Sequence, residues 1–328
     1  MSEMENGIKR VVSDDGSSSN KLMYRDKEGQ LTNLLVDNAF TRVKKSGLHP
    51  VSKKPFYSYS VDGGRSYCWD IYGDDSLSEN LDFQMSEHSL FSTHIGLHKA
   101  GILGDVELIC TVPINAYFNP TTFEVNDNVI KAKQNHMMRK ITPDNAALKT
   151  ANIVSVKVMP ECFPFVLQQL DRVETNPRDL VLGFDQGGST GDIYVCDAGT
   201  LTPQLMSHDV IGFNRIINWI MKSCLDQGCS VFDAKEIIKA KSFGEFEGNI
   251  DALIKMIDDT VEDIINFIQR EAGAKIQRIK HVFLTGGPSI MLKERLEASN
   301  LFNSEVKFYV SENPEFSLAS AIADFEDI

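Results

Sequence analysis

Two short segments rich in aspartate, glycine and serine most constrain the fold of this 328-residue chain, because they match each other about one domain length apart. The first reads Asp15-Gly16-Ser17-Ser18 and the second Asp185-Gln186-Gly187-Gly188-Ser189-Thr190, so the two aspartates are 185 − 15 = 170 residues apart. Apolar, alternating runs flank each segment: IKRVV and KLMYRD around the first, DLVLGF and DIYVCDAG around the second. Small turn residues between two extended runs indicate a β-hairpin. The chain therefore reads as two similarly built halves that face one another.

Apolar residues at helical spacing predict helices between the extended runs. The clearest covers residues 249–272, where isoleucines and leucines form one stripe and Gly273 provides a stop. The same pattern predicts helices near 86–100, 163–174, 210–226 and 289–299, and a short last one over SLASAIADF. The polar stretch 115–143, with its basic run KAKQNHMMRK, predicts a surface loop and a solvated helix. Strands that alternate with helices indicate an α/β architecture.

Composition narrows the class of protein. The net charge of −13 repels a phosphate backbone, so direct DNA binding is not expected. No run approaches the roughly 18 apolar residues of a membrane span, and the acidic start MSEMENG does not resemble a signal peptide. Six cysteines without a CxxC pair predict neither a disulfide scaffold nor a zinc site, and Cys110 and Cys196 lie in apolar runs typical of buried strands. We therefore expect a cytoplasmic protein that does not contact membranes.

The paired hairpins suit a nucleoside triphosphate bound between the two halves. Small residues let backbone N–H groups approach phosphate oxygens, and serine hydroxyls add donors. Mg²⁺ is typically held through one or two carboxylates together with substrate phosphates, which one aspartate per hairpin would provide. Lys21, on the returning strand, would point its charge at the phosphates. Taken singly, each segment would read as an ordinary turn, and it is the second copy that favours the phosphate-binding interpretation. The usual GxxxxGK[ST], GxGxxG and HExxH signatures are absent.

Two further segments could complete such a site. HVFLTGGPS (281–289) runs from a strand through Gly286 and Gly287 toward a helix, a connection that allows close backbone approach to a flat ring or ribose. Glu161 lies between two prolines, where a carboxylate could orient or deprotonate a water that attacks a γ-phosphate. Without that context, the first would be a common strand-to-helix connection and the second an exposed loop glutamate.

Two other patterns carry less weight. Residues 187–191 match the G-x-S-x-G elbow of serine hydrolases, with His208 and His281 as potential bases, but a strand rather than a helix follows the turn. His94 and His98 lie four residues apart on a predicted helix, yet no third metal ligand is nearby, so a packing or surface role is expected.

In this combination the motifs resemble those of the actin-like ATPase superfamily and, more narrowly, the plasmid-segregation actins of the ParM/StbA type. The resemblance extends over nearly the whole chain. The segments that carry it are VVSDDGSSSNKL (11–22), DVELICTVPINAYFN (105–119), IKAKQNHMMRKIT (130–142), VKVMPECFPF (156–165), LGFDQGGSTGDI (182–193) and HVFLTGGPS (281–289). The chain departs from the family pattern at Gln186 and Pro288, which leaves the choice between ATP and GTP open.

The resemblance implies an actin-like fold, with two ribonuclease-H-like α/β domains around a nucleotide cleft. Domain I would comprise residues 1–165 and the C-terminal helix 312–328, and domain II residues 166–311. Asp15 and Asp185 would hold Mg²⁺, and Glu161 with Asp185 would be catalytic. The implied nucleotide-binding residues are Asp15, Gly16, Ser17, Ser18, Asn20, Lys21, Gly187, Gly188, Ser189, Thr190, Gly286, Gly287 and Pro288.

The resemblance also implies an activity and partners. We expect a filament-forming ATPase that polymerises with Mg·ATP or Mg·GTP into polar, double-stranded filaments and drives plasmid copies apart. DNA would be reached through a centromere-binding adaptor protein of the ParR type. Two alternatives within the superfamily remain open, a small-molecule kinase and a nucleotide-gated scaffold that does not hydrolyse.

Overall fold

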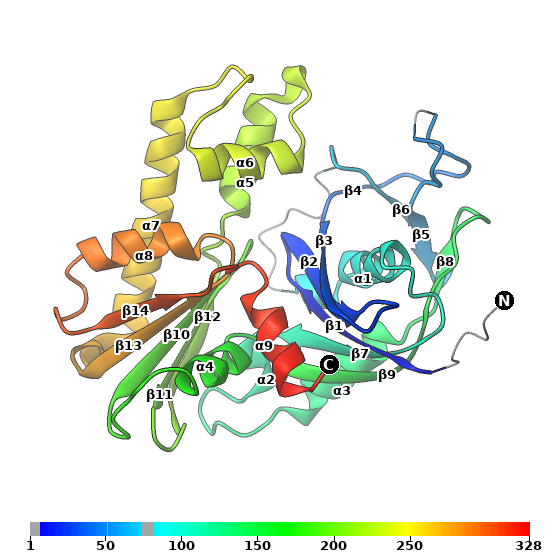
Figure 1. Ribbon diagram of the computed structural model, residues 1–328. Coiled ribbons are helices and arrows are strands. Elements are labelled where there is room, and N and C mark those ends of the chain that lie inside the picture. Colours follow the sequence, from blue (N-terminus) through cyan, green and yellow to red (C-terminus); the bar gives the residue numbers. More distant parts are fainter. Residues whose placement is uncertain (1–6, 51, 74–81) are drawn as a thin grey trace.

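The computed structural model describes residues 7–50, 52–73 and 82–328. Figure 1 shows two halves, each built around a sheet of its own. The acidic segment 1–6, which we expect not to act as a signal peptide, lies outside the described residues. Within the described ranges, no helix is both long enough and apolar enough to cross a membrane.

The first half contains a five-stranded sheet with the order β3-β2-β1-β7-β9. β1, β2 and β3 form an antiparallel meander, and β7 and β9 extend the sheet in parallel on the other side of β1. The first predicted hairpin is confirmed as β1 and β2, whereas the sequence analysis did not identify β3. The bounds are β1 (Lys9–Asp15), β2 (Ser19–Arg25), β3 (Leu31–Asp37), β7 (Asp105–Val112) and β9 (Asn152–Pro160).

The second half repeats this topology in the sheet β12-β11-β10-β13-β14. Again three strands form an antiparallel meander, and two more run parallel to its first strand. Two sheets with one topology confirm the duplication that the matched segments predict. The bounds are β10 (Leu180–Gln186), β11 (Gly191–Asp197), β12 (Pro203–Asp209), β13 (Ile279–Thr285) and β14 (Lys307–Val310).

The strand register, however, gives an alignment of the two hairpins that is shifted by one residue from the one in which Asp15 matches Asp185. Asp15 pairs with Asn20 in the first hairpin, and Gln186 pairs with Gly191 in the second, with four residues in each turn. The equivalent of Asp185 is therefore Asp14, and the offset is 185 − 14 = 171 residues. Successive side chains of a strand point to opposite faces, so this single residue decides which aspartate faces which side of the sheet.

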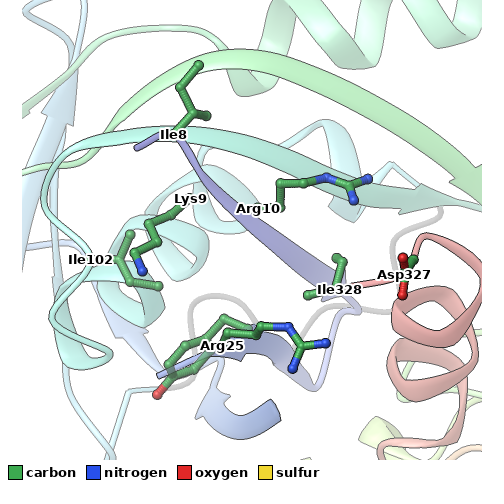
Figure 2. A pocket seen from close by; sticks show the side chains of 8 residues that line it. Ile8, Lys9, Arg10, Arg25, Ile102, Asp327 and Ile328 are labelled. Carbon is green, nitrogen blue, oxygen red and sulfur yellow. The ribbon is translucent and has the colours of Figure 1, made fainter. Parts of the chain in front are cut away.

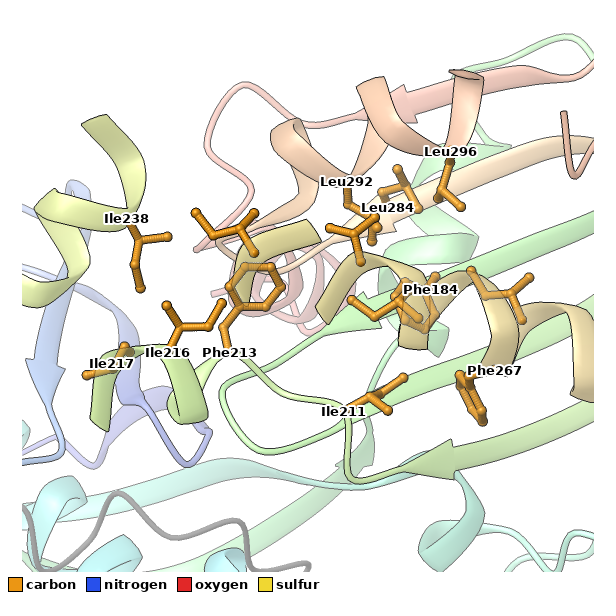
Figure 3. Close-up of a cluster of buried hydrophobic side chains, with 14 of the residues drawn as sticks. Phe184, Ile211, Phe213, Ile216, Ile217, Ile238, Phe267, Leu284, Leu292 and Leu296 are labelled. Atoms are coloured by element: carbon orange, nitrogen blue, oxygen red, sulfur yellow. The ribbon is translucent and has the colours of Figure 1, made fainter. Parts of the chain in front are cut away.

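The core of the second half lies between its sheet and the long helix α7 (Figure 3). Phe184 of β10 and Leu284 of β13 pack with Phe267 of α7, because the stripe of apolar residues predicted for this helix is buried against the sheet. The predicted helices 249–272 and 289–299 are confirmed. The helix predicted over 210–226 is shorter in the structure, where it covers Asn214–Ser223, and α6 was not predicted. The bounds are α5 (Asn214–Ser223), η2 (Leu225–Gln227), α6 (Val231–Ala240), α7 (Ile250–Ala272), η3 (Gly273–Arg278) and α8 (Ser289–Ala298).

The first half carries a small additional sheet, β4-β6-β5-β8, which covers one side of α1. Its Tyr59 packs on Phe91 of α1. α1 confirms the helix predicted near 86–100. The bounds are β4 (Phe40–Thr41), β5 (Ser58–Val61), β6 (Ser66–Trp69), η1 (Phe83–Met85), α1 (Glu87–Lys99), α2 (Ile114–Tyr117), α3 (Asp127–Met137) and β8 (Ile141–Pro143).

Two short helices lie where the halves meet. α9 (Ser317–Phe325), drawn in red in Figure 1, returns the chain from the second half to the first. Its Leu318 and Ile322 pack with Val12, Met23 and Ile109 of the first sheet. α4 (Phe163–Leu170) lies beside α9 and is four residues shorter at its C-terminal end than the predicted helix 163–174. The chain thus passes from the first sheet to the second between β9 and β10, and α9 brings it back to the first sheet after β14.

Candidate functional site

A cavity of about 730 Å³ lies between the two halves, and most of the predicted site residues line it. Both hairpins contribute, together with the loop after β13 and the residue that follows β9. The predicted residues that line it are Gly16, Ser17, Ser18, Lys21, Glu161, Asp185, Gly187, Gly188, Ser189, Thr190, Gly286, Gly287 and Pro288. Asp15 and Asn20 are not among its lining residues.

Asp14, not Asp15, is the aspartate that the first hairpin places in the cavity. Its Oδ2 lies 3.3 Å from Lys21 Nζ on the neighbouring strand, since the two residues are register partners. Burial raises the pKa of Asp14, although the positive charge of Lys21 opposes this shift. The expected role of Asp15 as a metal ligand is therefore corrected, because adjacent residues of a strand face opposite ways.

Asp15 instead forms a fully buried ion pair behind the hairpin. Its Oδ2 accepts hydrogen bonds from Lys133 Nζ at 2.5 Å and from Ser89 Oγ at 2.6 Å, and both charged side chains are inaccessible to solvent. Lys133 belongs to α3, so the basic run predicted as a solvated face sends one lysine into the core. Asn20 is also buried, where its amide donates to Thr93 Oγ1 and its carbonyl accepts from Ser13. These two predicted ligands support the hairpin from behind.

Four of the carboxylates that line the cavity are close enough to shift one another's pKa: Asp14, Glu161, Asp185 and Asp192. Burial and the charges of Asp14 and Asp192 raise the pKa of Asp185 to about 8, against a smaller opposing effect of Lys21. Burial likewise raises the pKa of Asp192 to about 7, although hydrogen bonds from Ile114 N and Thr190 and one shared with Glu161 oppose the shift. Such a cluster, with Lys21 as its close cation, is suited to a bound positive charge.

Glu161 occupies the place where β9 ends. Its backbone N–H donates to Val112 O at 2.9 Å, and the next residue, Cys162, has a φ of 63° that turns the chain into α4. Burial, followed by the charges of Asp192 and Asp185, raises its pKa well above the usual range. Glu161 Oε1 accepts a hydrogen bond from Gln84 Nε2 at 2.6 Å. The stiff, proline-flanked loop thus presents a carboxyl group to the cavity, as the sequence predicts.

Two glycines allow close backbone approach at the edge of the cavity. A Cβ on Gly188 would lie 2.5 Å from Ser18 Cβ and 2.6 Å from Asn214 Oδ1, so the two hairpins touch across the halves only because this residue has no side chain. Gly286 has a φ of +92°, and a Cβ there would lie 2.1 Å from Gln186 O. Its N–H donates to Pro314 O at 3.0 Å, which ties the loop after β13 to the approach to α9.

Apolar side chains of the second half also line the cavity, together with charged side chains of α6. They are Phe213, Ile217, Phe232, Ile290 and Met291, with Lys235, Glu236 and Lys239. Lys235 also reaches the first half, where it bonds to Asp37 and lies 3.5 Å from Ser18 O. A cavity lined both by polar groups of the hairpins and by apolar side chains offers the surfaces that a nucleotide requires.

Three polar groups near the hairpin aspartates are among the lining residues that the sequence motifs did not predict: Asp14, Asp192 and Gln84. The sequence does contain a signal for the first two. Aligning DDGSSSNK (14–21) with DQGGSTGD (185–192) without a gap places Asp14 over Asp185 and Lys21 over Asp192. Gln84 carried none, because it belongs to no motif and reaches the site only through the fold.

The weaker patterns have structural explanations. Ser189 is followed by β11, not by a helix, so the context that a serine nucleophile requires is absent. His94 is buried and its pKa falls to about 4 because burial disfavours the charged ring. His98 Nδ1 contacts Lys149 O. All six cysteines are free and buried, including Cys110 and Cys196, as predicted. Within the described part of the chain, no three His, Cys, Asp or Glu side chains form a direct metal site.

A smaller pocket of about 230 Å³ lies at the opposite end of β1 from the hairpin (Figure 2). It is lined by Ile8, Lys9, Arg10, Tyr24, Arg25, Ile102, Asp327 and Ile328. Of the cations that line it, Arg10 pairs with Glu107 at 3.4 Å and with Glu326 at 3.2 Å. None of the predicted site residues lines it.

Solved structures with the same architecture define the class of this fold. The archaeal actin homolog Ta0583, in complex with ADP, is 16% identical and has a TM-score of 0.68, with 98% of this chain and 99% of that chain covered. A 15-stranded ParM filament from Clostridium botulinum is 13% identical, with a TM-score of 0.67 and the same coverage. The Alp12 filament structure is 15% identical, with a TM-score of 0.55 and coverage of 97% and 99%. The chain has an actin-like fold, and its large cavity lies between the halves.

The family follows from the sequence itself. The family model described as plasmid segregation protein ParM, N-terminal, matches residues 9–172, which is half of the chain. The chain therefore belongs to the ParM/StbA family, as its motifs predict. No match is found among curated proteins.

Proposed function

We propose that this protein is a nucleotide-dependent, filament-forming ATPase that moves plasmid DNA. The observation that carries the proposal is the pair of equivalent hairpins, which bring Asp14 and Asp185 to one cavity of nucleotide size. The solved Ta0583 complex with ADP supports nucleotide binding, and the ParM and Alp12 filament structures support self-association. Family membership supports the role in plasmid segregation.

The residues fit a magnesium nucleotide. Asp14 and Asp185, one carboxylate from each hairpin in the same cavity, would hold the ion through its waters. When bound, Mg²⁺ would supply charge neutralisation for the phosphates. The N–H groups of residues 16–18 and 187–190 would bind phosphate oxygens, with Lys21 beside them, and residues 286–288 would contact the nucleoside. Glu161 would orient the attacking water and accept its proton.

The proposed filament would couple nucleotide hydrolysis to contacts between the two domains and between neighbouring subunits. Residues 1–165 with 312–328 would form domain I, and 166–311 domain II, with the nucleotide between them. One heterologous contact repeated head to tail generates an open filament, and loss of the γ-phosphate would change the contacts between the halves. DNA would be reached through a centromere-binding adaptor of the ParR type, since the chain carries a charge of −13. The proposed compartment is the cytoplasm.

Light scattering with Mg·ATP and Mg·GTP, with negative-stain microscopy of the same samples, tests the proposal. We expect scattering to rise with a nucleoside triphosphate and then decay as phosphate is released, and Glu161→Ala to give persistent filaments. A protein that stays monomeric at tens of micromolar with either nucleotide would contradict it, because mass action favours assembly at such concentrations. Nucleotide turnover that requires an added small-molecule acceptor would indicate a kinase. Filaments that form without release of phosphate would indicate a scaffold that does not hydrolyse nucleotide.

A further inference from the structure

Gln84 lines the cavity without belonging to either hairpin. It lies in η1, just before α1, and its side chain is 7% exposed. Its Nε2 donates to Glu161 Oε1 at 2.6 Å and to Thr111 Oγ1 at 3.1 Å. Because Thr111 belongs to β7 and Glu161 follows β9, this amide connects the catalytic carboxyl to a central strand of the first sheet.

The Glu161 side chain needs such a connection. Its backbone is fixed by the bond to Val112 O, but the long side chain keeps several rotatable bonds. Asp192, which shares a hydrogen bond with Glu161, and Asp185 also face it, but both are carboxylates and repel it when ionised. Gln84 is a neutral donor, so it can fix one oxygen of Glu161 without changing the charge that the cavity offers to a cation.

The backbone of Gln84 is held in turn by the buried ion pair behind the first hairpin. Gln84 O accepts hydrogen bonds from Lys133 Nζ at 2.6 Å and from Ser89 Oγ at 3.3 Å. The same two donors bind Asp15. Asp15 follows Asp14 directly in β1, so one continuous set of contacts joins the first hairpin to Glu161.

We propose that Gln84 is the positioning residue for Glu161, and that the Asp15–Lys133 pair fixes Gln84 in relation to the first hairpin. This inference rests on the proposed function, because it assigns to Gln84 a role in the hydrolysis that Glu161 would perform. The expected loss is in the chemical step rather than in nucleotide binding, since Gln84 contacts Glu161 and not the two hairpins.

Gln84→Met tests this, because methionine keeps the length of the side chain and removes the donor. Phosphate release would be measured as kcat and KM for the magnesium nucleotide, with the polymerised fraction determined by sedimentation in the same samples. We expect kcat to fall by about tenfold or more when variant and wild type are compared at the same polymerised fraction. KM should change by less than about threefold. The matched control is Gln134→Met, which removes a similar glutamine bond, to Val156 O, on α3 and should leave kcat unchanged.

A double-mutant cycle with Glu161→Gln separates positioning from a general structural effect. Gln84→Met should cause no further loss when Glu161 has already lost its carboxylate. If Gln84→Met does not fold, as judged by urea unfolding, Thr111→Val takes its place, because it removes the second acceptor of the Gln84 amide and should lower kcat in the same direction.

Three results would overturn the inference: a kcat within twofold of wild type, a loss confined to KM, or an unchanged effect in the Glu161→Gln background. The first two would leave the proposed function standing, because the wild-type protein would still hydrolyse nucleotide. Absence of hydrolysis by the wild-type protein would refute both.

Discussion

Asp14 and Asp185 occupy equivalent positions in the two hairpins and both face the same cavity. The duplication therefore places one carboxylate per half opposite the other. Lys21 and Asp192, which are their register partners, are equivalent in the same way but opposite in charge. The two hairpins thus have the same backbone arrangement but differ in one side chain. At this position the first half provides a cation and the second half an additional carboxylate. This asymmetry makes the site directional, with Lys21 on one side and the acidic pair Asp192 and Glu161 on the other.

The first prediction separates Asp14 from Asp15. Asp14→Asn should lower magnesium-dependent hydrolysis about a hundredfold, because it removes a cavity carboxylate, and it should leave the fold intact. Asp15→Asn should instead destabilise the protein by about 3–5 kcal/mol, since it leaves Lys133 buried without its partner charge. Phosphate release and urea unfolding of both variants would measure this.

The control for Asp15 is the double variant Asp15→Asn, Lys133→Met. Removing both charges should restore part of the lost stability, because neither group is then buried unpaired. The assignment would be wrong if Asp14→Asn were the less stable of the two single variants.

The second prediction concerns pH. Burial, followed by the charges of Asp14 and Asp192, raises the pKa of Asp185 in the folded protein from 3.8 to about 8. The folded state therefore binds a proton that the unfolded chain has released, so the stabilisation is present below about pH 4 and is lost as the pH rises toward 8. Asp185→Asn should raise the Tm, by a few degrees at pH 8 and little at about pH 5. A pH-independent difference in Tm, measured beside exposed Asp226→Asn, would exclude this origin.

The third prediction uses the close approach of the hairpins. Gly188→Ala places a methyl group within 2.6 Å of Ser18 and Asn214, which forces the two halves apart. Overpacking of this kind costs about 1–3 kcal/mol, so nucleotide affinity should fall about 10- to 100-fold. A fluorescent nucleotide analogue would report the Kd. Gly104→Ala, where a methyl group meets nothing within 4 Å, should bind as wild type does; equal affinity of the two variants would contradict the expected contact.

The fourth prediction concerns Lys235, which bonds to Asp37 and approaches Ser18 O of the other half. Lys235→Met should weaken the contact between α6 and the first sheet and increase the radius of gyration of the nucleotide-free protein in solution scattering. Lys255→Met is the control, because Lys255 pairs with Asp259 on the same exposed helix face. An unchanged radius for Lys235→Met would show that this ion pair does not hold the halves together.

Much of the fold could be predicted from local pattern. The apolar stripe of residues 250–272 specifies α7, and the small residues at 16–18 and 187–190 specify two turns, because both signals depend on neighbours in the chain. β3 was missed although it pairs with the neighbouring β2, because Val36 is its only buried residue and its apolar pattern is weak. The small sheet was missed as well, and its β5 pairs with the distant β8. The end of α4 at Leu170 was also missed.

The sequence by itself determined that this chain has two matching halves, the residue types of a magnesium nucleotide site, and a place in the ParM/StbA family. Tertiary structure decided which residues of those types face the cavity. Asp14 faces it and Asp15 does not, because strand register turns adjacent side chains to opposite faces. Gln84 and Lys133 acquired their partners only when η1 and α3 packed against the first sheet. Contacts of that range depend on the whole fold, and no local run of residues encodes them.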